Sequence, residues 1–231
     1  MTRLRKDPRV WGTGTGTGTG TGSGTERGIV RVDTPEGLSE IRRPDCAAVI
    51  WQRSPLPRFQ TWVDGLAREQ LPRTRVILRS ELVRDTITTV AQTCGTPECA
   101  EREMLVEDVS ALAAVFANVA NARYLRLRLD IVTTDACRKF HVDAVRARLV
   151  CTYRGTGTQY GHLSGGGEPQ GVFSVPTGAP TVMRGTLWPE TPASGLLHRS
   201  PPIGGTGETR LLLVLDPIDD PEEEPEDHVV H

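Results

Sequence analysis

The apolar residues in the first half of the chain recur mainly at helical spacing. Residues 47–51 form a short apolar run that predicts one buried strand. After Pro55 and Pro57, apolar residues follow every three or four positions, which predicts a helix. A second helix is predicted to end near Gly95, and the strongest helical pattern covers residues 101–122. The three patterns are carried by Leu56, Phe59, Trp62, Val63 and Leu66, then Leu82, Val83, Ile87 and Val90, then Leu105, Val109, Leu112, Phe116 and Val119.

From Arg123 onward the apolar residues recur at every second position instead. This spacing is typical of half-buried strands, and it predicts strands over residues 125–131 and 145–153. Shorter strands are expected at residues 171–175, 181–184, 195–199 and 210–216, with turn residues between them. Many short strands without intervening helices indicate an antiparallel sandwich or jelly roll. We therefore expect an α+β protein, in which a mostly helical N-terminal half packs on a C-terminal jelly roll.

Composition divides the chain into a folded centre and two polar ends. Residues 12–24 are a Thr-Gly repeat, which predicts a flexible leader over residues 1–27. Strict alternation of glycine does not match a phosphate-binding loop, and no lysine follows the repeat. Residues 218–231 are acidic and broken by proline, so we expect a solvated tail. A single domain is predicted over residues 28–217, helical to about residue 122 and a jelly roll from about residue 123.

The overall charge and the cysteines exclude several classes of function. A net charge of −2 and a pI near 6.2 give no general reason to bind nucleic acid or an anionic membrane. No apolar run has bilayer-spanning length, and no apolar stretch of a secretory signal follows the basic start. Five cysteines without such a signal favour reduced thiols. We expect a cytoplasmic protein with a substrate that the sequence does not identify, and no oligomeric state is predicted.

Three side chains from the strand-rich half form a candidate metal site. His141 and Asp143 are two positions apart, so on a strand they point to the same side. His198, in a later strand, could supply a second imidazole. Two histidines and one carboxylate on one face of a metal are typical of non-haem Fe(II) oxygenases. Arg210 opens the last strand, where its cation could hold the distal carboxylate of a dicarboxylic co-substrate.

Other interpretations of these residues stay open. His141 and Asp143 could be a surface pair, with His198 packed separately against a strand. The same three ligands, with water in a fourth position, also suit zinc. Cys94 and Cys99 could supply half of a structural zinc site, but no second cysteine pair has metal-ligand spacing. A serine hydrolase is excluded because the chain contains no G-x-S-x-G motif.

The order His141-x-Asp143, His198, Arg210 resembles the double-stranded β-helix of the Fe(II)/2-oxoglutarate dioxygenases. Residues 33–217 more closely resemble the bacterial family called domain of unknown function 1826. The segments that carry this resemblance are LRLRL at 125–129, DACRKFHVD at 135–143, CTYRG at 151–155 and HRSPP at 198–202.

The family resemblance implies no established activity, and family members often lie near genes for zinc handling, which keeps a role in zinc homeostasis open. The oxygenase resemblance implies His141, Asp143 and His198 as metal ligands and Arg210 as the residue that binds 2-oxoglutarate. It also implies that Tyr153 donates a second hydrogen bond to the same carboxylate. We therefore predict an Fe(II)/2-oxoglutarate-dependent oxygenase of unknown substrate. The alternative is a non-catalytic, cupin-like protein that binds zinc or senses metal.

Overall fold

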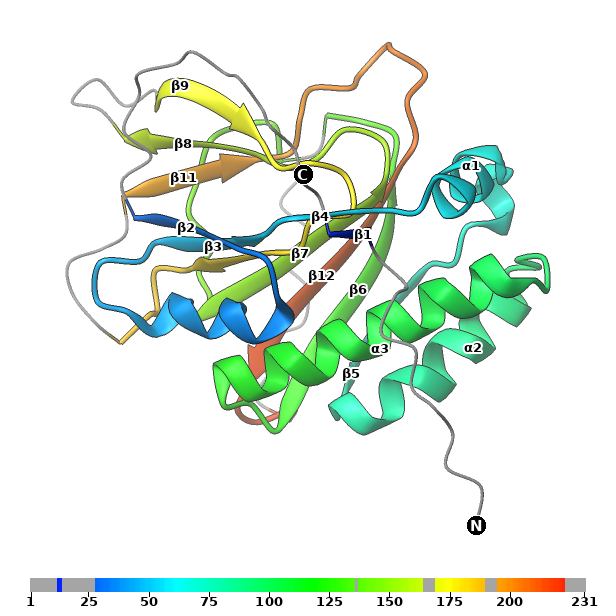
Figure 1. The fold of residues 1–231 in the computed structure, drawn as a ribbon, viewed down its shortest axis with the longest axis horizontal. Helices are drawn as coiled ribbons and strands as arrows, with labels where there is room; N and C mark the ends of the chain where they lie inside the picture. Colours follow the sequence, from blue (N-terminus) through cyan, green and yellow to red (C-terminus); the bar gives the residue numbers. More distant parts are fainter. Residues whose placement is uncertain (1–11, 14–27, 136, 164–168, 190–194, 223–231) are drawn as a thin grey trace.

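The computed structural model describes residues 12–13, 28–135, 137–163, 169–189 and 195–222. In this part of the chain, helices lie on one face of a large, twisted sheet, and a small sheet lies on its other face (Figure 1). None of the helices in the described ranges is long and apolar enough to span a membrane.

The α-helices begin and end at residues that suit these positions. The helix α1 (Pro57–Gly65) starts with a proline, whose missing N–H has no partner in a first turn anyway. The long helix α3 (Ala100–Ala120) is ended by Asn121, which takes a left-handed backbone with φ of 47°. The helix α2 (Val83–Thr93) packs on α3, and short 3-10 helices lie at Pro35–Arg42, Arg68–Gln70 and Ser80–Leu82.

The large sheet has the strand order β2-β3-β10-β7-β12-β6-β5. Its neighbouring strands are antiparallel except for β2 and β3, which are parallel. A two-residue strand, β1 (Gly12–Thr13), pairs separately with β4 (Arg53–Ser54). The strands of the large sheet are β2 (Ile29–Val32), β3 (Ala48–Trp51), β5 (Thr74–Leu78), β6 (Tyr124–Val132), β7 (Ala147–Arg154), β10 (Thr181–Arg184) and β12 (Arg210–Ile218).

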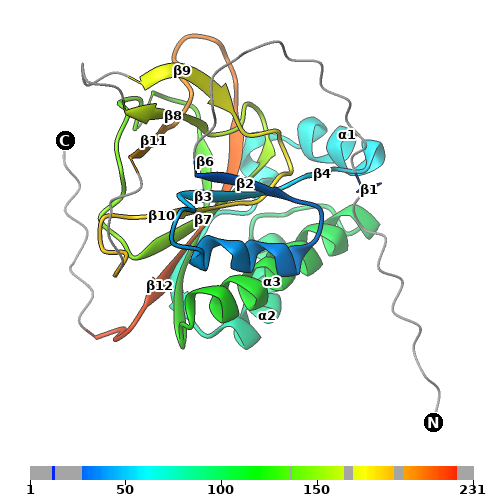
Figure 2. The same ribbon diagram turned by 60° about the vertical axis from the view of Figure 1, so that its left-hand side comes forward.

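The small sheet has the order β11-β8-β9, formed by Leu196–Arg199, Gln159–Leu163 and Pro169–Ser174. His141 adds to its edge by pairing with His198 on β11. Along the chain from β6 to β12, the polypeptide crosses repeatedly between the two sheets, and Figure 2 shows the small sheet stacked over the large one. The crossings bring residues far apart in sequence to one end of the space between the sheets.

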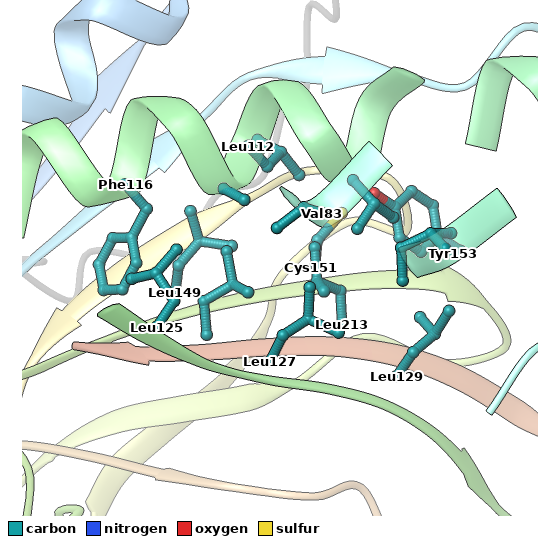
Figure 3. Packing of buried hydrophobic residues seen from close by; sticks show 14 of the residues in the cluster. Val83, Leu112, Phe116, Leu125, Leu127, Leu129, Leu149, Cys151, Tyr153 and Leu213 are labelled. Atoms are coloured by element: carbon teal, nitrogen blue, oxygen red, sulfur yellow. The ribbon is translucent and has the colours of Figure 1, made fainter. Parts of the chain in front are cut away.

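Two groups of buried apolar residues lie on the two faces of the large sheet. Figure 3 shows the helix-side group, in which Leu112 and Phe116 of α3 meet Leu125, Leu127 and Leu213 of the sheet. The second group lies between the sheets and includes Val150, Val214 and Tyr160. Alternate residues of β7 and β12 therefore enter different cores, as the period of two in a strand requires.

The expectation of a mostly helical N-terminal half is wrong. The predicted helices are present, but β2, β3 and β5 also come from this half and belong to the large sheet. The strand β5 pairs along its whole length with β6, so part of the N-terminal half extends the sheet and does not pack on it as a separate layer. The predicted leader at residues 1–27, apart from Gly12 and Thr13, and the tail beyond residue 222 lie outside the described residues.

Candidate metal centre

The backbone holds His141 and His198 directly opposite each other. The His141 N–H donates to the His198 carbonyl at 3.0 Å, and the His198 N–H donates to the His141 carbonyl at 2.9 Å. Residues that exchange both hydrogen bonds in an antiparallel pair have side chains on the same face. The ring centroids of the two histidines are accordingly 4.6 Å apart. The sequence thus brings two distant imidazoles together through ordinary strand pairing.

Asp143 completes the group from the segment that leads into β7. Its Oδ2 lies 2.8 Å from His198 Nε2, and its Oδ1 lies 3.5 Å from His141 Nε2. All three candidate ligand atoms lie within 4.8 Å of one another. Two ligands each about 2.1 Å from one metal ion are about 3.0 Å apart at a right angle and about 3.4 Å apart at a tetrahedral angle. The observed spacings fit both kinds of coordination.

The hydrogen bonds of His141 determine which of its ring nitrogens can bind a metal. His141 Nδ1 lies 2.8 Å from the Lys139 carbonyl, which can only accept, so Nδ1 carries a proton and Nε2 is the nitrogen that faces the site. Although His198 Nε2 is close to Asp143 Oδ2, this buried oxygen has no partner with hydrogen-bond geometry. The nitrogen and the oxygen thus lie at the spacing of two ligands of one ion, and they attract each other directly where no ion is bound.

A layer of charged side chains surrounds the carboxylate of Asp143. The Arg148 guanidinium forms an ion pair with Asp143 Oδ1, and its Nε donates to Asp216 Oδ1 at 2.6 Å. Burial acts to raise the pKa of Asp143, but the imidazoles of His141 and His198 and the charge of Arg148 outweigh it and hold the pKa well below its usual range. Asp143 is therefore ionised, as a metal ligand must be.

Arg210 faces the same inter-sheet space as the candidate ligands. On β12, Leu211, Leu213 and Leu215 enter the helix-side core, so Arg210 and Asp216 point to the opposite face. The Arg210 side chain is fully buried; its Nε donates to the Thr156 carbonyl at 2.6 Å and its Nη2 lies 3.5 Å from Thr152 Oγ1. Its Nη1 is buried and has no hydrogen-bond partner among the described residues.

Tyr153 does not contact this site, in contrast to what the oxygenase resemblance implies. Its side chain shares the helix-facing register of Cys151 on β7, and it points toward the helices in Figure 3. Its hydroxyl donates to Asp108 of α3 at 2.6 Å. Tyr153 therefore belongs to the opposite face of the sheet from His198 and cannot bind a co-substrate there.

The other candidates have no ligand set in the described part of the chain. Cys94 ends α2 and Cys99 precedes α3, and neither belongs to a group of potential ligands. Of the Thr-Gly repeat, only Gly12 and Thr13 lie within the described residues. Sequence reasoning missed Arg148 and Asp216. Asp216 directly follows an apolar run within the same strand, and this position of an acidic residue could have indicated that it is buried.

A family model described as "Protein of unknown function (DUF1826)" matches residues 32–216. The chain belongs to this family. The match confirms the resemblance found in residues 33–217. A search of the curated proteins found no match to the chain.

Several solved structures are similar to this DUF1826 chain at low sequence identity. The dioxygenase for auxin oxidation 1 from Arabidopsis thaliana, in its 2-oxoglutarate complex, is 7% identical with a TM-score of 0.49, and the alignment covers 86% of this chain and 94% of that one. The rice dioxygenase for auxin oxidation is 11% identical, with 84% of each chain covered and a TM-score of 0.44. An oxidoreductase of the 2OG-Fe(II) oxygenase family from Burkholderia pseudomallei is 14% identical over 81% of this chain and 93% of that one, with a TM-score of 0.39. TM-scores below 0.5 do not establish a shared activity.

Proposed function

We propose that this protein is a non-haem Fe(II)-dependent oxygenase that uses 2-oxoglutarate as co-substrate. The observation that carries the proposal is the convergence of His141, Asp143 and His198 on one point, on the same sheet face as a buried, incompletely paired Arg210. Two imidazoles and one carboxylate leave coordination positions open for other ligands. A metal-binding module alone has no need for the buried cation.

The proposed fold is a jelly roll with helices on its outer face. The strands β6, β12, β7 and β10 form one of its sheets, and the His141 segment, β11, β8 and β9 form the other. The strands β2, β3 and β5 then extend the first sheet at its edges. In this arrangement the candidate ligands and Arg210 all face the interior between the sheets.

Arg210 is the residue we propose for the distal carboxylate of 2-oxoglutarate. Burial lowers the pKa of Arg210 to about 10, although the charge of Glu208 opposes the shift. A buried cation with a spare N–H is costly unless an anion pairs with it. A carboxylate can accept from two guanidinium N–H groups at once, so it would satisfy Nη1 and compensate the charge.

Each protein side chain has a defined part in this proposal. His141 and His198 would each bind the metal through Nε2, and the Lys139 carbonyl fixes the orientation of the His141 ring. Arg148 orients Asp143 through an ion pair with the Oδ1 atom of Asp143. Iron held by these ligands would supply the redox chemistry that couples decarboxylation of a 2-oxo acid to oxygenation of a C–H bond.

Anaerobic spectroscopy tests the proposal. Adding Fe(II) and then 2-oxoglutarate to the purified chain is expected to give the visible charge-transfer band of a chelated 2-oxo acid. Arg210→Ala is expected to weaken the apparent affinity for 2-oxoglutarate about tenfold to a hundredfold, because it removes hydrogen bonds from a charged donor. Arg154→Ala is the matched control, since Arg154 pairs with Leu211 of β12 but donates to the Leu66 carbonyl.

Two results would contradict parts of this proposal. If the parent chain binds zinc tightly and gives no band with Fe(II) and 2-oxoglutarate, it is a zinc-binding protein without this activity. If Arg210→Ala binds 2-oxoglutarate as well as the parent does, Arg210 has no role in co-substrate binding. The comparisons give no support to the expected role in zinc homeostasis.

A further inference from the structure

Asp216 of β12 is a fully buried carboxylate that is connected to the candidate metal centre through Arg148. Leu215 of β12 lies directly opposite Leu149 of β7, so Asp216 and Arg148 are the next residues along the two antiparallel strands. Val214, two residues before Asp216, faces the space between the sheets, so Asp216 faces it as well. Ordinary strand pairing therefore places this carboxylate and this guanidinium side by side.

The N–H groups of Arg148 are divided between two carboxylates. Its Nε donates to Asp216 Oδ1 at 2.6 Å and its Nη2 donates to Asp216 Oδ2 at 2.8 Å, which is the bidentate pairing of a guanidinium with a carboxylate. Its Nη1 forms the ion pair with Asp143 Oδ1. Asp216 thus occupies one edge of the guanidinium, and Asp143 is contacted by the remaining nitrogen.

This division leaves one oxygen of Asp143 for a metal. Oδ1 is held by Arg148, whereas Oδ2 lies 2.8 Å from His198 Nε2, where a shared ion would bind. A guanidinium whose Nη1 and Nη2 both turned to Asp143 would pair with the two oxygens of that carboxylate at once. An arginine would then bind Oδ2 in competition with the metal ion.

Asp216 is held in a fixed position from which it can restrain Arg148. Arg126 of β6 lies directly opposite it, with Nη1 3.7 Å from Asp216 Oδ2, and Arg128 Nη2 donates to the same oxygen at 3.2 Å. The side chain of Asp216 is 1% exposed, while those of Arg148 and Asp143 are 16% and 12% exposed. Two neighbouring strands therefore anchor Asp216 at the end of the contact series that leads to the metal centre.

We propose that Asp216 is a positioning residue of the metal centre, which holds the guanidinium of Arg148 so that Asp143 keeps Oδ2 available to the metal. Without the charge of Asp216, the cation of Arg148 still has Asp143 as a carboxylate partner. Its low exposure then favours pairing with both oxygens of Asp143. The inference rests on the metal centre of the proposed function, but it does not depend on 2-oxoglutarate or on oxygen chemistry.

Titration of the metal-free chain with Co(II), followed by visible absorbance, tests this restraint without a co-substrate. Asp216→Asn keeps the size of the side chain and removes its charge, and the affinity for Co(II) is expected to fall about tenfold to a hundredfold. Asp108→Asn is the matched control, because Asp108 is a buried carboxylate that pairs with Arg53 on the helix-covered face of the sheet. This control is expected to lose stability and to bind Co(II) as the parent does.

A second change in the same chain distinguishes the restraint of Arg148 from a structural role of Asp216. Arg148→Gln in the Asp216→Asn background removes the cation that would otherwise pair with both oxygens of Asp143. The double variant has the net charge of the parent, and its affinity for Co(II) is expected to lie within about tenfold of that of the parent. Because a structural defect is not repaired by a second loss of contacts, affinity that recovers relative to Asp216→Asn supports the inference.

Circular dichroism of each variant makes every outcome decisive. Unchanged Co(II) affinity in Asp216→Asn overturns the inference, and so does an equal loss of affinity in Asp108→Asn. A folded double variant that binds Co(II) no more tightly than Asp216→Asn overturns it too. If Asp216→Asn does not fold, a folded double variant with the affinity of the parent supports the inference. Loss of the fold in both would identify Asp216 as a structural residue and would overturn it.

The anaerobic band with Fe(II) and 2-oxoglutarate separates this inference from the proposed function. If the parent gives the band and Asp216→Asn binds Co(II) as the parent does, the oxygenase proposal stands and the restraint of Arg148 fails. If the variants show the expected Co(II) affinities but the parent gives no band, the restraint stands and the oxygenase proposal fails. If the parent does not bind Co(II), the metal centre and the inference both fail.

Discussion

Two buried charged clusters, one on each face of the large sheet, differ in how completely their polar atoms are paired. On the helix-covered face, Arg53 pairs with both oxygens of Asp108 at 2.6 and 2.7 Å, and Tyr153 donates to the same carboxylate. On the face beneath the small sheet, Arg210 and Arg128 keep N–H groups without partners among the described residues, and Asp143 keeps an oxygen without a hydrogen bond there.

This difference shows how one sheet can combine a structural core with a reactive site. A buried ion pair whose donors and acceptors are all hydrogen-bonded stabilises a single packing arrangement. It has no free donor or acceptor with which to bind a ligand. Buried polar groups with unsatisfied hydrogen-bonding atoms lower the stability of the fold, and they are typical of binding sites. The helix-covered face is therefore expected to determine stability, and the other face to determine ligand binding.

The largest expected effect is the loss of stability in Asp108→Ala. The change leaves Arg53 buried without its counter-charge and Tyr153 without its acceptor, so we expect a loss of about 3 to 5 kcal/mol in the free energy of unfolding. Urea unfolding followed by circular dichroism measures it. Glu107→Ala, the exposed neighbour that pairs with Arg84, should cost about 1 kcal/mol or less. Equal losses in the two variants would contradict the role of the helix-covered face.

The second largest expected effect is the loss of metal affinity in His198→Ala, which should remain folded. His198→Ala removes one of three candidate ligands, and we expect metal affinity to fall by more than the roughly tenfold to hundredfold loss seen when a supporting residue is removed. Titration with Co(II), followed by its visible absorbance, measures the affinity. The far-UV circular dichroism spectrum should stay that of the parent. Retained affinity in the double variant His141→Ala with His198→Ala would rule out this metal site.

A smaller effect on the free energy of unfolding is expected from Arg210→Met, and the sign of the change distinguishes a binding role from a structural one. Replacing a buried, incompletely paired cation with an apolar side chain of similar length removes a desolvation cost. The free energy of unfolding is expected to rise by about 1 kcal/mol, while the affinity for 2-oxoglutarate falls about tenfold to a hundredfold, as in Arg210→Ala. A fall of the same size would mean that Arg210 acts as a structural residue.

The smallest expected effect is a difference in alkylation between the buried and the exposed cysteines. Burial raises the pKa of Cys151 to about 12 and that of Cys46 to about 11, so both thiols stay protonated at pH 8. Iodoacetamide at that pH is expected to label the exposed Cys137 in the native chain and to label Cys46 and Cys151 only after unfolding. Mass spectrometry of the digested chain identifies the modified residues. Rapid native labelling of Cys151 would show that the helix-covered face is open.

Most strands of the strand-rich half could be predicted from the sequence because the alternation of apolar and polar residues is strong there. The strands over residues 125–131, 145–153, 181–184, 195–199 and 210–216 are confirmed within a few residues by β6, β7, β10, β11 and β12. The three helical patterns of the first half are also confirmed by α1, α2 and α3. The strands β2, β5 and β8 were missed. The strands β2 and β5 are short, and each acquires its stability from a partner strand distant in sequence.

The site was predicted in part for similar reasons. His141 and Asp143 are close together in sequence, so their spacing alone suggested a shared face. Tyr153 was misplaced although it alternates with Leu149 and Cys151, which already indicated the core-facing register. Arg126 and Arg128 look like solvent-facing positions in a strand pattern. Only the tertiary structure shows that they meet the buried Asp216.

A crystal grown anaerobically with Fe(II) and 2-oxoglutarate tests the central claim most directly. Diffraction data collected on both sides of the iron absorption edge locate the metal without assumptions about its ligands. We predict one iron peak between His141 Nε2, His198 Nε2 and an oxygen of Asp143, with 2-oxoglutarate bound to the metal and reaching Arg210. Iron bound elsewhere, or no iron peak in crystals of a chain that remains folded, would contradict the account.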